Sequence, residues 1–523
     1  MGRSWVALTV LQLITFLGLF YIVPLIEVIQ ISLSSGGWTE VIWGQLFITF
    51  LKFSFTQAIL TTVFCLLIGI PTGYALTRLQ PFARKFLSVL VLVPFLIPPM
   101  SILLGFVIIY EPNGLLTQLL GFQLIDVFGT LSGVVLAHTI YNISIVTRLI
   151  ASNFESLDED KITLAKSSGA SPLEVWRYVY LPHILPSIYA SILLVFLLSF
   201  NSFAVVLMIG NVKLQTLEVM IYSQSRLRLN YGLAAKIAII QLLINVLVTI
   251  AFIRITKETK YTGTYRDPPE VSKKLRILST GWIFAVILFT WQSILATVYQ
   301  LSRTSGRSYI LDGRYSSLLG TSPLRVIENT LFFGVMTGVL ATSFAISLLV
   351  QRLFKDGRTT SYILGFISIM PMMSSSITLS LGLLLAYRST SFFSDDIWIF
   401  IVASHILASL PFVTQTVLTG AKQVPTEYIT LSQSLGATKL GTMRYVLLPL
   451  LAPSIIVAFL FGMAVSFGEF GATFFLVRGE WSTISIGIQR LFATRSNFLP
   501  LQYSLILVLI TLLSFSLVER LRK

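Results

Sequence analysis

The chain has 523 residues, of which 55% are hydrophobic and only 11% are charged, and its mean hydropathy is +0.84. Soluble domains carry about 25% charged residues, so this composition excludes an ordinary soluble protein and predicts an integral membrane protein. The net charge of +15 could suit nucleic acid, but the positive residues gather in the loops on one predicted side of a membrane. We therefore expect a lipid bilayer, and no nucleic acid, among its partners.

Twelve apolar runs are long enough to cross a bilayer as helices, which need about 20 residues each. None alternates between apolar and polar residues as a barrel strand does, so we predict an all-α membrane protein. The runs form two sets of six. The first set lies near 6–30, 52–77, 86–110, 130–151, 184–209 and 233–254, and the second near 279–300, 327–351, 361–387, 397–419, 452–477 and 500–518.

Lys and Arg are distributed unevenly over the loops between these runs. With the amino terminus in the cytoplasm, 24 of them fall on the cytoplasmic side and 13 on the outer side. The positive-inside rule therefore predicts that both termini are cytoplasmic. The first run lacks a small-residue cleavage site, so we expect a retained anchor helix. The polar stretch 256–276 is predicted to be a cytoplasmic linker between a first half, 1–255, and a second half, 277–523.

One polar segment occurs twice, 267 residues apart. Residues 163–188 match residues 430–455 without a gap, and 14 of the 26 aligned positions are identical. The identical positions include a Gly-Ala pair, an Arg-Tyr pair and two prolines, which chance similarity between apolar helices would not reproduce in order. We therefore predict two homologous six-helix halves. They should share one orientation, because each half has an even number of spans.

Each copy is predicted to form two short helices joined at a glycine. In the first copy, a loop at about 153–182, Gly169 follows an amphipathic stretch where a helix end favours positive φ. Ser171 and Pro172 should begin the next helix, which we expect to end at Pro182. The second copy, at about 421–449, repeats this pattern with Pro425, Gly436, Thr438 and Pro449. The two loops should form equivalent knobs on the cytoplasmic face, suited to a pair of identical partners.

The two copies resemble the Glu-Ala-Ala loop of permeases in binding-protein-dependent ABC importers, and the fused length is similar to that of thiamine and ferric-iron permeases. The resemblance implies a type I ABC importer permease fold in a bacterial cytoplasmic (inner) membrane. It also implies two cytoplasmic ABC ATPase subunits docked on the loops, an extracytoplasmic solute-binding protein, and a small-molecule or ion substrate. The residues it assigns to the ATPase-coupling loops are Asp160, Thr163, Gly169, Ala170, Arg177, Leu181 and Pro182, with Glu427, Thr430, Gly436, Ala437, Arg444, Leu448 and Pro449 in the second copy.

The acid of the Glu-Ala-Ala triplet is missing from both copies. Thr163 and Thr430 stand in its place, and Asp160 and Glu427 lie three residues earlier, on the same face of a helix. These acids either replace the missing Glu or only favour the amino terminus of a helix through its dipole. Both interpretations stay open.

The sequence holds no Gly-x-x-x-x-Gly-Lys-Ser/Thr motif that could cradle ATP phosphates. It also lacks a nucleophile elbow and clustered metal ligands, and its single cysteine, Cys65, cannot form a disulfide within the chain. We therefore predict no enzyme activity, no metal and no cofactor in this chain, with ATP bound by a partner ATPase. The pairs Gly69/Gly73 and Gly334/Gly338 have helix-packing spacing.

Polar residues inside apolar runs are candidates for a translocation path. His138 and His405 occupy equivalent positions in the two halves, and Glu469 aligns with Ser202, which follows Asn201. In related permeases the fifth helix helps to line the path. The alternative is that the histidines are hydrogen-bonded core residues and that Glu469 is structural.

Two other classes of protein would share some of these features. A twelve-helix secondary transporter with parallel repeats explains the helix count and the duplication, but not the repeated polar knob. A channel would need a filter-like loop, and the sequence shows none. An ATP-driven importer is therefore the favoured function. Thiamine or ferric iron is the substrate that the resemblance indicates.

Overall fold

The computed structural model describes residues 11–211, 213–258, 272–303, 310, 312–354, 367, 369–493 and 498–521. Within these ranges the chain is helical, and eleven helices are long and apolar enough to cross a membrane. The predicted all-α membrane fold is confirmed. The eleven are Leu11–Ser34, Gln45–Thr77, Pro99–Leu120, Leu131–Glu155, Pro172–Phe200, Tyr231–Ile255, Lys273–Ser302, Pro323–Val350, Ile397–Gln423, Lys439–Gly468 and Phe498–Leu517.

The chain forms two compact units that do not follow the order of the sequence. Unit 1 consists of Met1–Val41, Met220–Leu242 and Thr304–Lys523, and unit 2 of Ile42–Val219 and Leu243–Arg303. The first long helix of each half thus belongs to the unit built mainly from the other half. The predicted halves, 1–255 and 277–523, describe the duplication of the sequence and remain a prediction.

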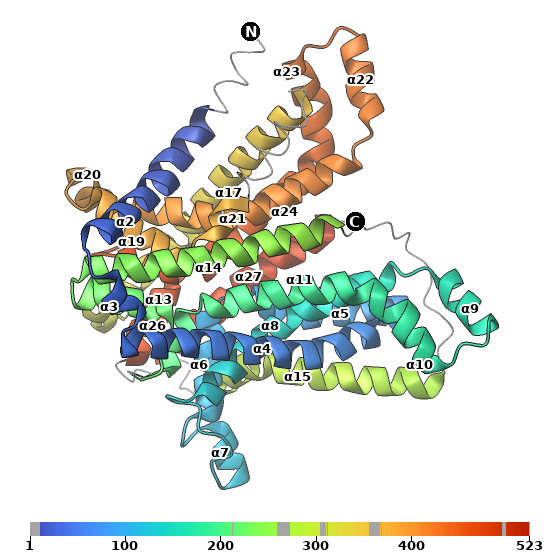
Figure 1. Cartoon of the computed structure of the whole chain (residues 1–523), viewed down its shortest axis with the longest axis horizontal. Coiled ribbons are helices and arrows are strands. Elements are labelled where there is room, and N and C mark those ends of the chain that lie inside the picture. Colours follow the sequence, from blue (N-terminus) through green and yellow to red (C-terminus); the bar gives the residue numbers. More distant parts are fainter. Residues whose placement is uncertain are drawn as a thin grey trace. The chain divides into compact units, whose positions relative to one another are not determined.

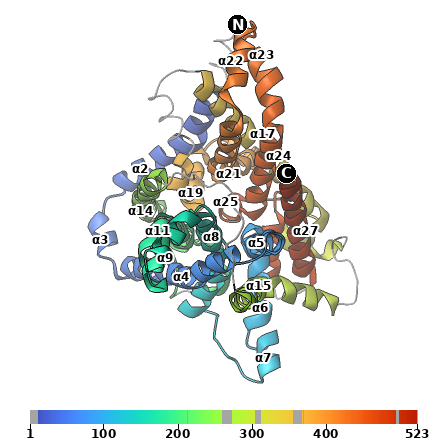
Figure 2. The same cartoon turned by 90° about the vertical axis from the view of Figure 1, so that its right-hand side faces the viewer.

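Unit 2 is a bundle of long helices with the first knob at one end (Figures 1 and 2). Helices α4 and α8 pack along each other, α11 packs on both, and α15 lies against α4, α5 and α6. The bounds are α4 (Gln45–Thr77), α5 (Pro81–Leu96), α6 (Pro99–Tyr110), α7 (Leu115–Leu120), α8 (Leu131–Glu155), α9 (Glu159–Ser167), α10 (Pro172–Val175), α11 (Leu181–Phe200), α12 (Ala204–Ile209) and α15 (Lys273–Ser302). Helices α13 (Leu217–Tyr222) and α14 (Tyr231–Glu258) have residues in both units.

Unit 1 repeats this packing with the second half. Helices α17, α21 and α24 pack on one another, and α2 lies against α19. The bounds are α2 (Val23–Ser34), α16 (Ser316–Leu319), α17 (Pro323–Phe354), α19 (Ser376–Tyr387), α20 (Ser391–Asp395), α21 (Ile397–Gln423), α22 (Thr426–Ser434), α23 (Lys439–Thr442), α24 (Leu448–Gly468), α25 (Gly471–Leu476), α26 (Ile484–Ala493) and α27 (Phe498–Leu521). Helix α3 (Trp38–Ile42) ends at the boundary between the units.

Four of the twelve predicted runs are not single helices, and the breaks in two of them, 184–209 and 452–477, belong to the candidate site below. The run 86–110 breaks at Ile97, whose ψ of 132° is extended, because two prolines follow and a residue before proline disfavours helix. The run 361–387 holds the 12-residue helix α19, and residues 361–366 and 368 of that run lie outside the described residues. Among the described residues, eleven helices have the length and hydropathy of a membrane span, and the predicted run 361–387 lies partly outside them.

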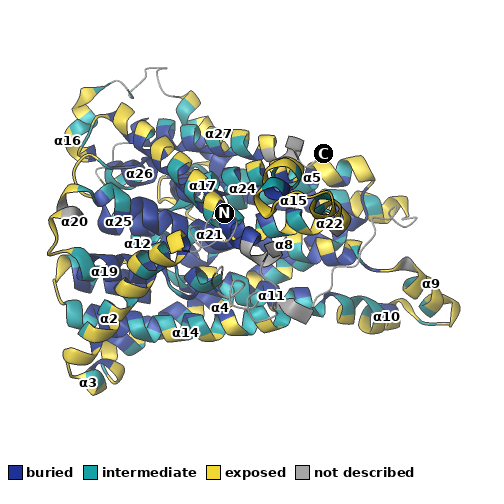
Figure 3. Cartoon of the chain, turned by 90° about the horizontal axis from the view of Figure 1, so that it is seen from above, coloured by how far each residue is buried: buried dark blue, intermediate teal, exposed yellow. Residues whose placement is uncertain are grey.

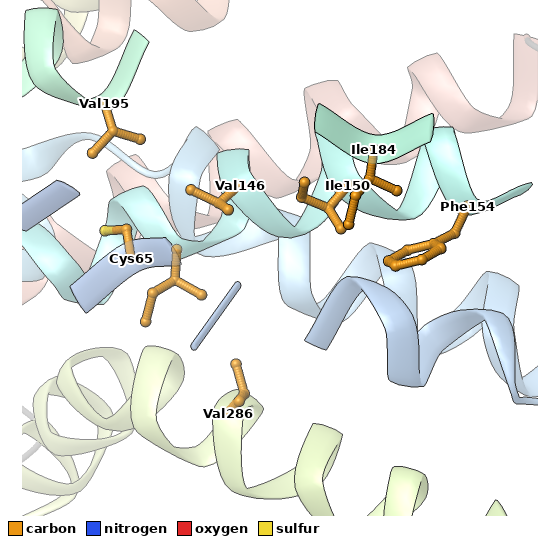
Figure 4. Packing of buried hydrophobic residues seen from close by; sticks show 8 residues of the cluster. Cys65, Val146, Ile150, Phe154, Ile184, Val195 and Val286 are labelled. Carbon is orange, nitrogen blue, oxygen red and sulfur yellow. The ribbon is translucent and has the colours of Figure 1, made fainter. Parts of the chain in front are cut away.

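The core of unit 2 is built on close contact between α4 and α8. Gly69 lies against Val146 and Gly73 against Ile150, at distances that leave no room for a Cβ, which confirms the predicted packing role of this glycine pair. Cys65 is fully buried among apolar side chains of four helices (Figure 4). The other members of this cluster are Ile143, Val146, Ile150, Phe154, Ile184, Val195 and Val286.

Each short helix α6 and α19 crosses the first long helix of the other half at a glycine. A Cβ on Gly105 would overlap the backbone of Ser293 in α15, and one on Gly382 would meet the backbone of Pro24 in α2. A tyrosine five residues later fastens each crossing: the Tyr110 hydroxyl donates to Gln292 Oε1 at 3.0 Å. The equivalent Tyr387 hydroxyl donates to a backbone carbonyl at 2.7 Å. The two glycine contacts therefore hold the first long helix of each half in the unit built mainly from the other half.

We expect Gly105→Ala to destabilise the protein by roughly 1–3 kcal/mol, the usual cost of overpacking, because the backbone it meets cannot rotate away. Gly281→Ala is the matched control, since Gly281 lies in α15 with open space around it. Alanine there should be neutral or stabilising by about 0.5–1 kcal/mol. Thermal unfolding of both variants in one detergent measures the difference, and equal melting temperatures would contradict the crossing.

Candidate functional site

The first knob consists of α9 and α10, which extend beyond the bundle of unit 2 (Figure 1). Asp158 begins α9 by accepting a hydrogen bond from the backbone N–H of Asp160 at 3.1 Å. Ser171 begins α10 in a reciprocal capping box: its Oγ accepts from Glu174 N at 3.3 Å, and its own N–H donates to Glu174 Oε2 at 2.7 Å. The prediction that Ser171 caps a helix opened by Pro172 is confirmed.

The Gly-Ala pair of each knob forms the turn between its two helices. Gly169 has φ of +86°, as predicted, and its N–H donates to Lys166 O while that of Ala170 donates to Ala165 O, both at 3.0 Å. These two bonds define a Schellman motif, which satisfies the last carbonyls of α9. The second knob has the same motif, with φ of +87° at Gly436 and 3.0 Å bonds from Gly436 N to Gln433 O and from Ala437 N to Ser432 O.

The second knob consists of α22 and α23 in unit 1. Pro425 precedes α22, and Thr438 caps α23 by accepting from Gly441 N at 3.1 Å, as the sequence predicts. The hydroxyls of Ser432 and Thr442 lie 2.9 Å apart and join the two helices. The two knobs therefore have the same construction.

The prediction that the second helix of each knob ends at Pro182 or Pro449 is wrong. The helix that begins at Pro172 continues through a π-helical turn, Trp176–Tyr180, into α11 and reaches Phe200. In the second copy the π-helical turn is Met443–Leu447. Each proline follows such a turn, where Leu181 N–H donates five residues back to Trp176 O, and we attribute its tolerance to the wider ring of the turn. Each knob is thus continuous with a membrane helix.

Both knobs expose large apolar side chains at the same three positions. Leu164 is 67% exposed and Leu431 58%, Leu173 75% and Leu440 46%, and Tyr178 68% and Tyr445 74%. Figure 3 shows α9 and α10 largely as exposed. Exposed apolar residues in a cluster mark an interaction surface. Our sequence prediction omitted these residues, although all three pairs are identical between the copies.

The predicted coupling residues lie on or beside this surface. Arg177 and Arg444 are exposed, and their guanidinium groups lie 5.7 Å and 5.6 Å from the rings of Tyr178 and Tyr445. Exposed in addition are Thr163, Gly169, Leu181 and Pro182 of the first knob and Thr430, Gly436, Ala437 and Pro449 of the second, while Ala170 and Leu448 are half-buried.

Asp160 and Glu427 each occupy the second position of a knob helix and are exposed. This position places a carboxylate close to the positive end of the helix dipole. It also leaves the carboxylate accessible to a partner. The geometry is compatible with both interpretations of these acids, so the replacement of the missing Glu remains a prediction.

The candidate path residues of the first half form a buried polar contact. His138 is fully buried in α8, with Nε2 2.7 Å from Ser202 Oγ. Asn201 accepts a hydrogen bond from Asn245 Nδ2 at 3.0 Å. In the second half both ring nitrogens of the buried His405 are engaged, Nδ1 with Ser466 Oγ and Nε2 with Thr473 Oγ1, each at 2.7 Å. The contacts of His405 favour a packing role.

The sequence predicted that Ser202 and Glu469 lie inside helices, and this prediction is wrong. They lie in equivalent breaks, one between α11 and α12 and the other between α24 and α25. Glu469 is half-buried, and its Oε1 accepts from the backbone N–H of Ala472 at 2.9 Å. An apolar run cannot reveal such a break, because both flanking helices are apolar. The carboxylate has a structural partner, and a role in the path remains a prediction.

Comparison with known proteins gives matches over most of the chain. Residues 65–260 and 331–523 each match the family described as the binding-protein-dependent transport system inner membrane component. The thiamine transport system permease protein ThiP of Haemophilus influenzae is 25% identical over 449 residues, which are 83% of this chain and 81% of that protein. ThiP of Salmonella typhimurium is 24% identical over 508 residues, 93% of this chain and 91% of that protein.

A further relative corresponds to part of the chain. The putative 2-aminoethylphosphonate transport system permease protein PhnU of Salmonella typhi is 32% identical over 213 residues, which are 39% of this chain and 73% of that protein. The two family matches together span well over half of the sequence. The chain therefore belongs to the family of inner membrane permeases of binding-protein-dependent ABC importers, and it carries two copies of the family domain.

Proposed function

We propose that this permease carries thiamine across the membrane after delivery by an extracytoplasmic solute-binding protein. The support is the extent of the likeness to the two thiamine permeases, 83% and 93% of this chain. The phosphonate permease corresponds to only 39% of it. Ferric iron, the other substrate indicated by the sequence, has no support from these relatives. Membership of the ABC permease family argues against the alternative function, a secondary transporter.

Two cytoplasmic ATPase subunits, one on each knob, are the partners that we propose to drive transport. One observation carries this proposal: two knobs of the same construction expose the same apolar residues at equivalent positions. A repeated surface suits two copies of one partner. The chain has no phosphate-binding loop of its own, so ATP would be bound and hydrolysed by that partner, and this chain would hold no cofactor. Docking of this kind places both knobs and both termini in the cytoplasm.

The substrate path is proposed to include the helix breaks at Ser202 and Glu469. A break in an apolar helix exposes backbone groups that need a polar or aqueous surrounding within a membrane. Glu469 also brings a carboxylate, which costs about 2.5–3.5 kcal/mol at the centre of a membrane helix unless water, a partner or substrate meets it. A cation such as thiamine would be a suitable counter-charge.

Valine in place of Gly169 or Gly436 should weaken binding of the ATPase. A positive φ costs an L-residue roughly 1–2 kcal/mol, and no neighbour lies within 4 Å of a Cβ at either glycine, so strain in the turn is the only cause. Gly169→Asn is the control, because asparagine tolerates this conformation. Co-purification with the partner ABC ATPase measures assembly. Unchanged assembly and uptake in both valine variants would remove the knobs as docking elements.

A charge on the exposed surface should disrupt docking without harming the fold. Leu173→Asp and Leu440→Asp replace side chains that are 75% and 46% exposed. Buried interface contacts of this kind contribute at least about 2 kcal/mol when they are hot spots, so we expect ATPase affinity to fall tenfold or more. The control is Leu119→Asp in α7, which is 83% exposed and distant in sequence from both knobs. Equal affinity of all three variants would refute the surface.

Glu469→Gln should reduce thiamine uptake about tenfold, equivalent to about 1.4 kcal/mol, while ATPase assembly stays normal. Glutamine keeps an oxygen that can accept from Ala472 N, so the break should persist and only the charge is lost. Glu480→Gln, an exposed acid, is the control. Uptake is measured over a range of thiamine concentrations at equal membrane abundance. A wild-type titration curve would leave Glu469 with a structural role alone.

A further inference from the structure

The stem of the first knob is held by a cluster of aromatic rings around a buried arginine. We call Tyr74, Arg78, Phe154, Trp176 and Tyr180 the joint cluster. Trp176 and Tyr180 are the first and last residues of the π-helical turn between α10 and α11, Tyr74 lies in α4, and Phe154 in α8. Phe154 is labelled at one end of the buried core in Figure 4. The cluster therefore joins the knob's helix to two helices of unit 2.

Arg78 makes the polar contacts of the joint cluster. It ends α4 and is only 9% exposed. Its guanidinium carbon lies 4.4 Å from the centre of the Tyr74 ring and 5.9 Å from that of Tyr180, and Nη2 donates to the Tyr180 hydroxyl at 3.1 Å. A cation over aromatic rings is stabilised most when water is excluded. Arg78 thus ties the end of α4 directly to the end of the π-helical turn.

The rings also contact one another across the three elements. Tyr74 lies edge-on to Phe154 and Trp176, with centroids 5.4 Å and 5.7 Å apart, and Phe154 lies 5.9 Å from Tyr180. Trp176 and Tyr180 lie 5.5 Å apart on the turn itself. Such pairs are favourable and geometrically specific. The widest turn of this helix is therefore braced on both of its ends.

A second set of contacts fastens the same helix just after Pro182. The ring nitrogen Nε2 of His183 lies 2.9 Å from Asn153 O and 3.1 Å from Ser156 Oγ at the end of α8. Asn153 Nδ2 donates to Ser187 Oγ in α11. These bonds oppose sliding of α11 against α8, so the stem is fixed both by rings and by hydrogen bonds.

The second half has none of the four rings at the equivalent positions. Leu348, Ala421, Met443 and Leu447 stand where the first half has Tyr74, Phe154, Trp176 and Tyr180. Gly420 and Leu450 replace Asn153 and His183. The two knobs thus present the same surface on stems that share an arginine, Arg78 and its counterpart Arg352, but differ at these six positions.

We propose that the joint cluster makes the first knob a rigid extension of unit 2. Arg78 is then a positioning residue that couples ATPase movement to α4 and α8. The second knob, which lacks the four rings, is coupled more loosely. The inference rests on the proposed docking of ATPases. A π-helical turn is a local departure from regular helix and a natural site for bending. Ring contacts have specific geometry and stiffen the turn, whereas aliphatic contacts are less directional and leave it freer to bend.

A matched pair of substitutions tests the difference between the halves. Trp176→Leu and Met443→Leu place the same residue at equivalent positions 267 residues apart. The permease is purified with its ATPase and binding protein, placed in liposomes, and assayed for thiamine imported per ATP hydrolysed. We expect Trp176→Leu to lower this ratio about fivefold, at the low end of typical coupling energies, and Met443→Leu to leave it unchanged. Equal ratios in the two variants would overturn the proposed difference.

Variants at Arg78 test its role separately. Arg78→Gln should uncouple hydrolysis from uptake, and Arg78→Lys should recover part of the coupling, because lysine keeps a cation over Tyr74 but loses the planar fork. If Arg78→Gln folds poorly, Tyr180→Phe removes the single hydrogen bond to Arg78, with the exposed Tyr189→Phe as its control. Uptake and hydrolysis falling in proportion, or neither changing, would overturn the role of Arg78.

The same assays separate this inference from the proposed function. A wild-type permease that binds no ATPase would refute the docking of ATPases on the knobs. A wild-type permease that binds the ATPase and imports thiamine, while the Trp176 and Arg78 variants keep its coupling ratio, would refute the joint cluster alone.

Discussion

The continuity of backbone hydrogen bonds from each knob into a membrane helix is the constraint on which the rest of this structure depends. The helix that begins at Pro172 runs to Phe200, and its counterpart runs from Lys439 to Gly468. Because a helix resists bending, a displacement of the knob must move the membrane helix unless the helix yields at a weak point. The weak point in each half is the π-helical turn, and its surroundings decide how much movement is passed on.

Local rules predicted the knobs well because their shape depends on short-range hydrogen bonds. A glycine at positive φ, a serine or threonine cap and a proline at the helix start each require only neighbouring residues, and Gly169, Ser171 and Thr438 are found as expected. The predicted helix end at Pro182 is wrong, because a proline need not stop a helix that reaches it through a π-helical turn. The exposed leucines were missed because apolar residues beside membrane helices are ordinarily assigned to packing.

The membrane helices were predicted from length and hydropathy, since a bilayer demands both. What these properties cannot show is where an apolar run breaks, as at Ser202 and Glu469, or which helices pack together. The exchange of α2 and α15 between the halves depends on glycine contacts such as Gly105 with Ser293, between residues almost 190 positions apart. The pair of prolines after Ile97 is the local sign of one such break.

The two halves began as copies of one sequence. The differences between them show where each half has since acquired its own constraints. The exposed surfaces of the knobs kept the same leucines and tyrosines, which fits the proposed pair of identical partners. The stems diverged as well: the four rings, Asn153 and His183 of the first half are replaced by aliphatic residues, methionine or glycine at the equivalent positions of the second. The helix breaks diverged too, with Ser202 in one half and Glu469 in the other. A fused chain permits this divergence because each position is encoded separately, so one half can specialise in transmitting force while the other places a carboxylate at its helix break.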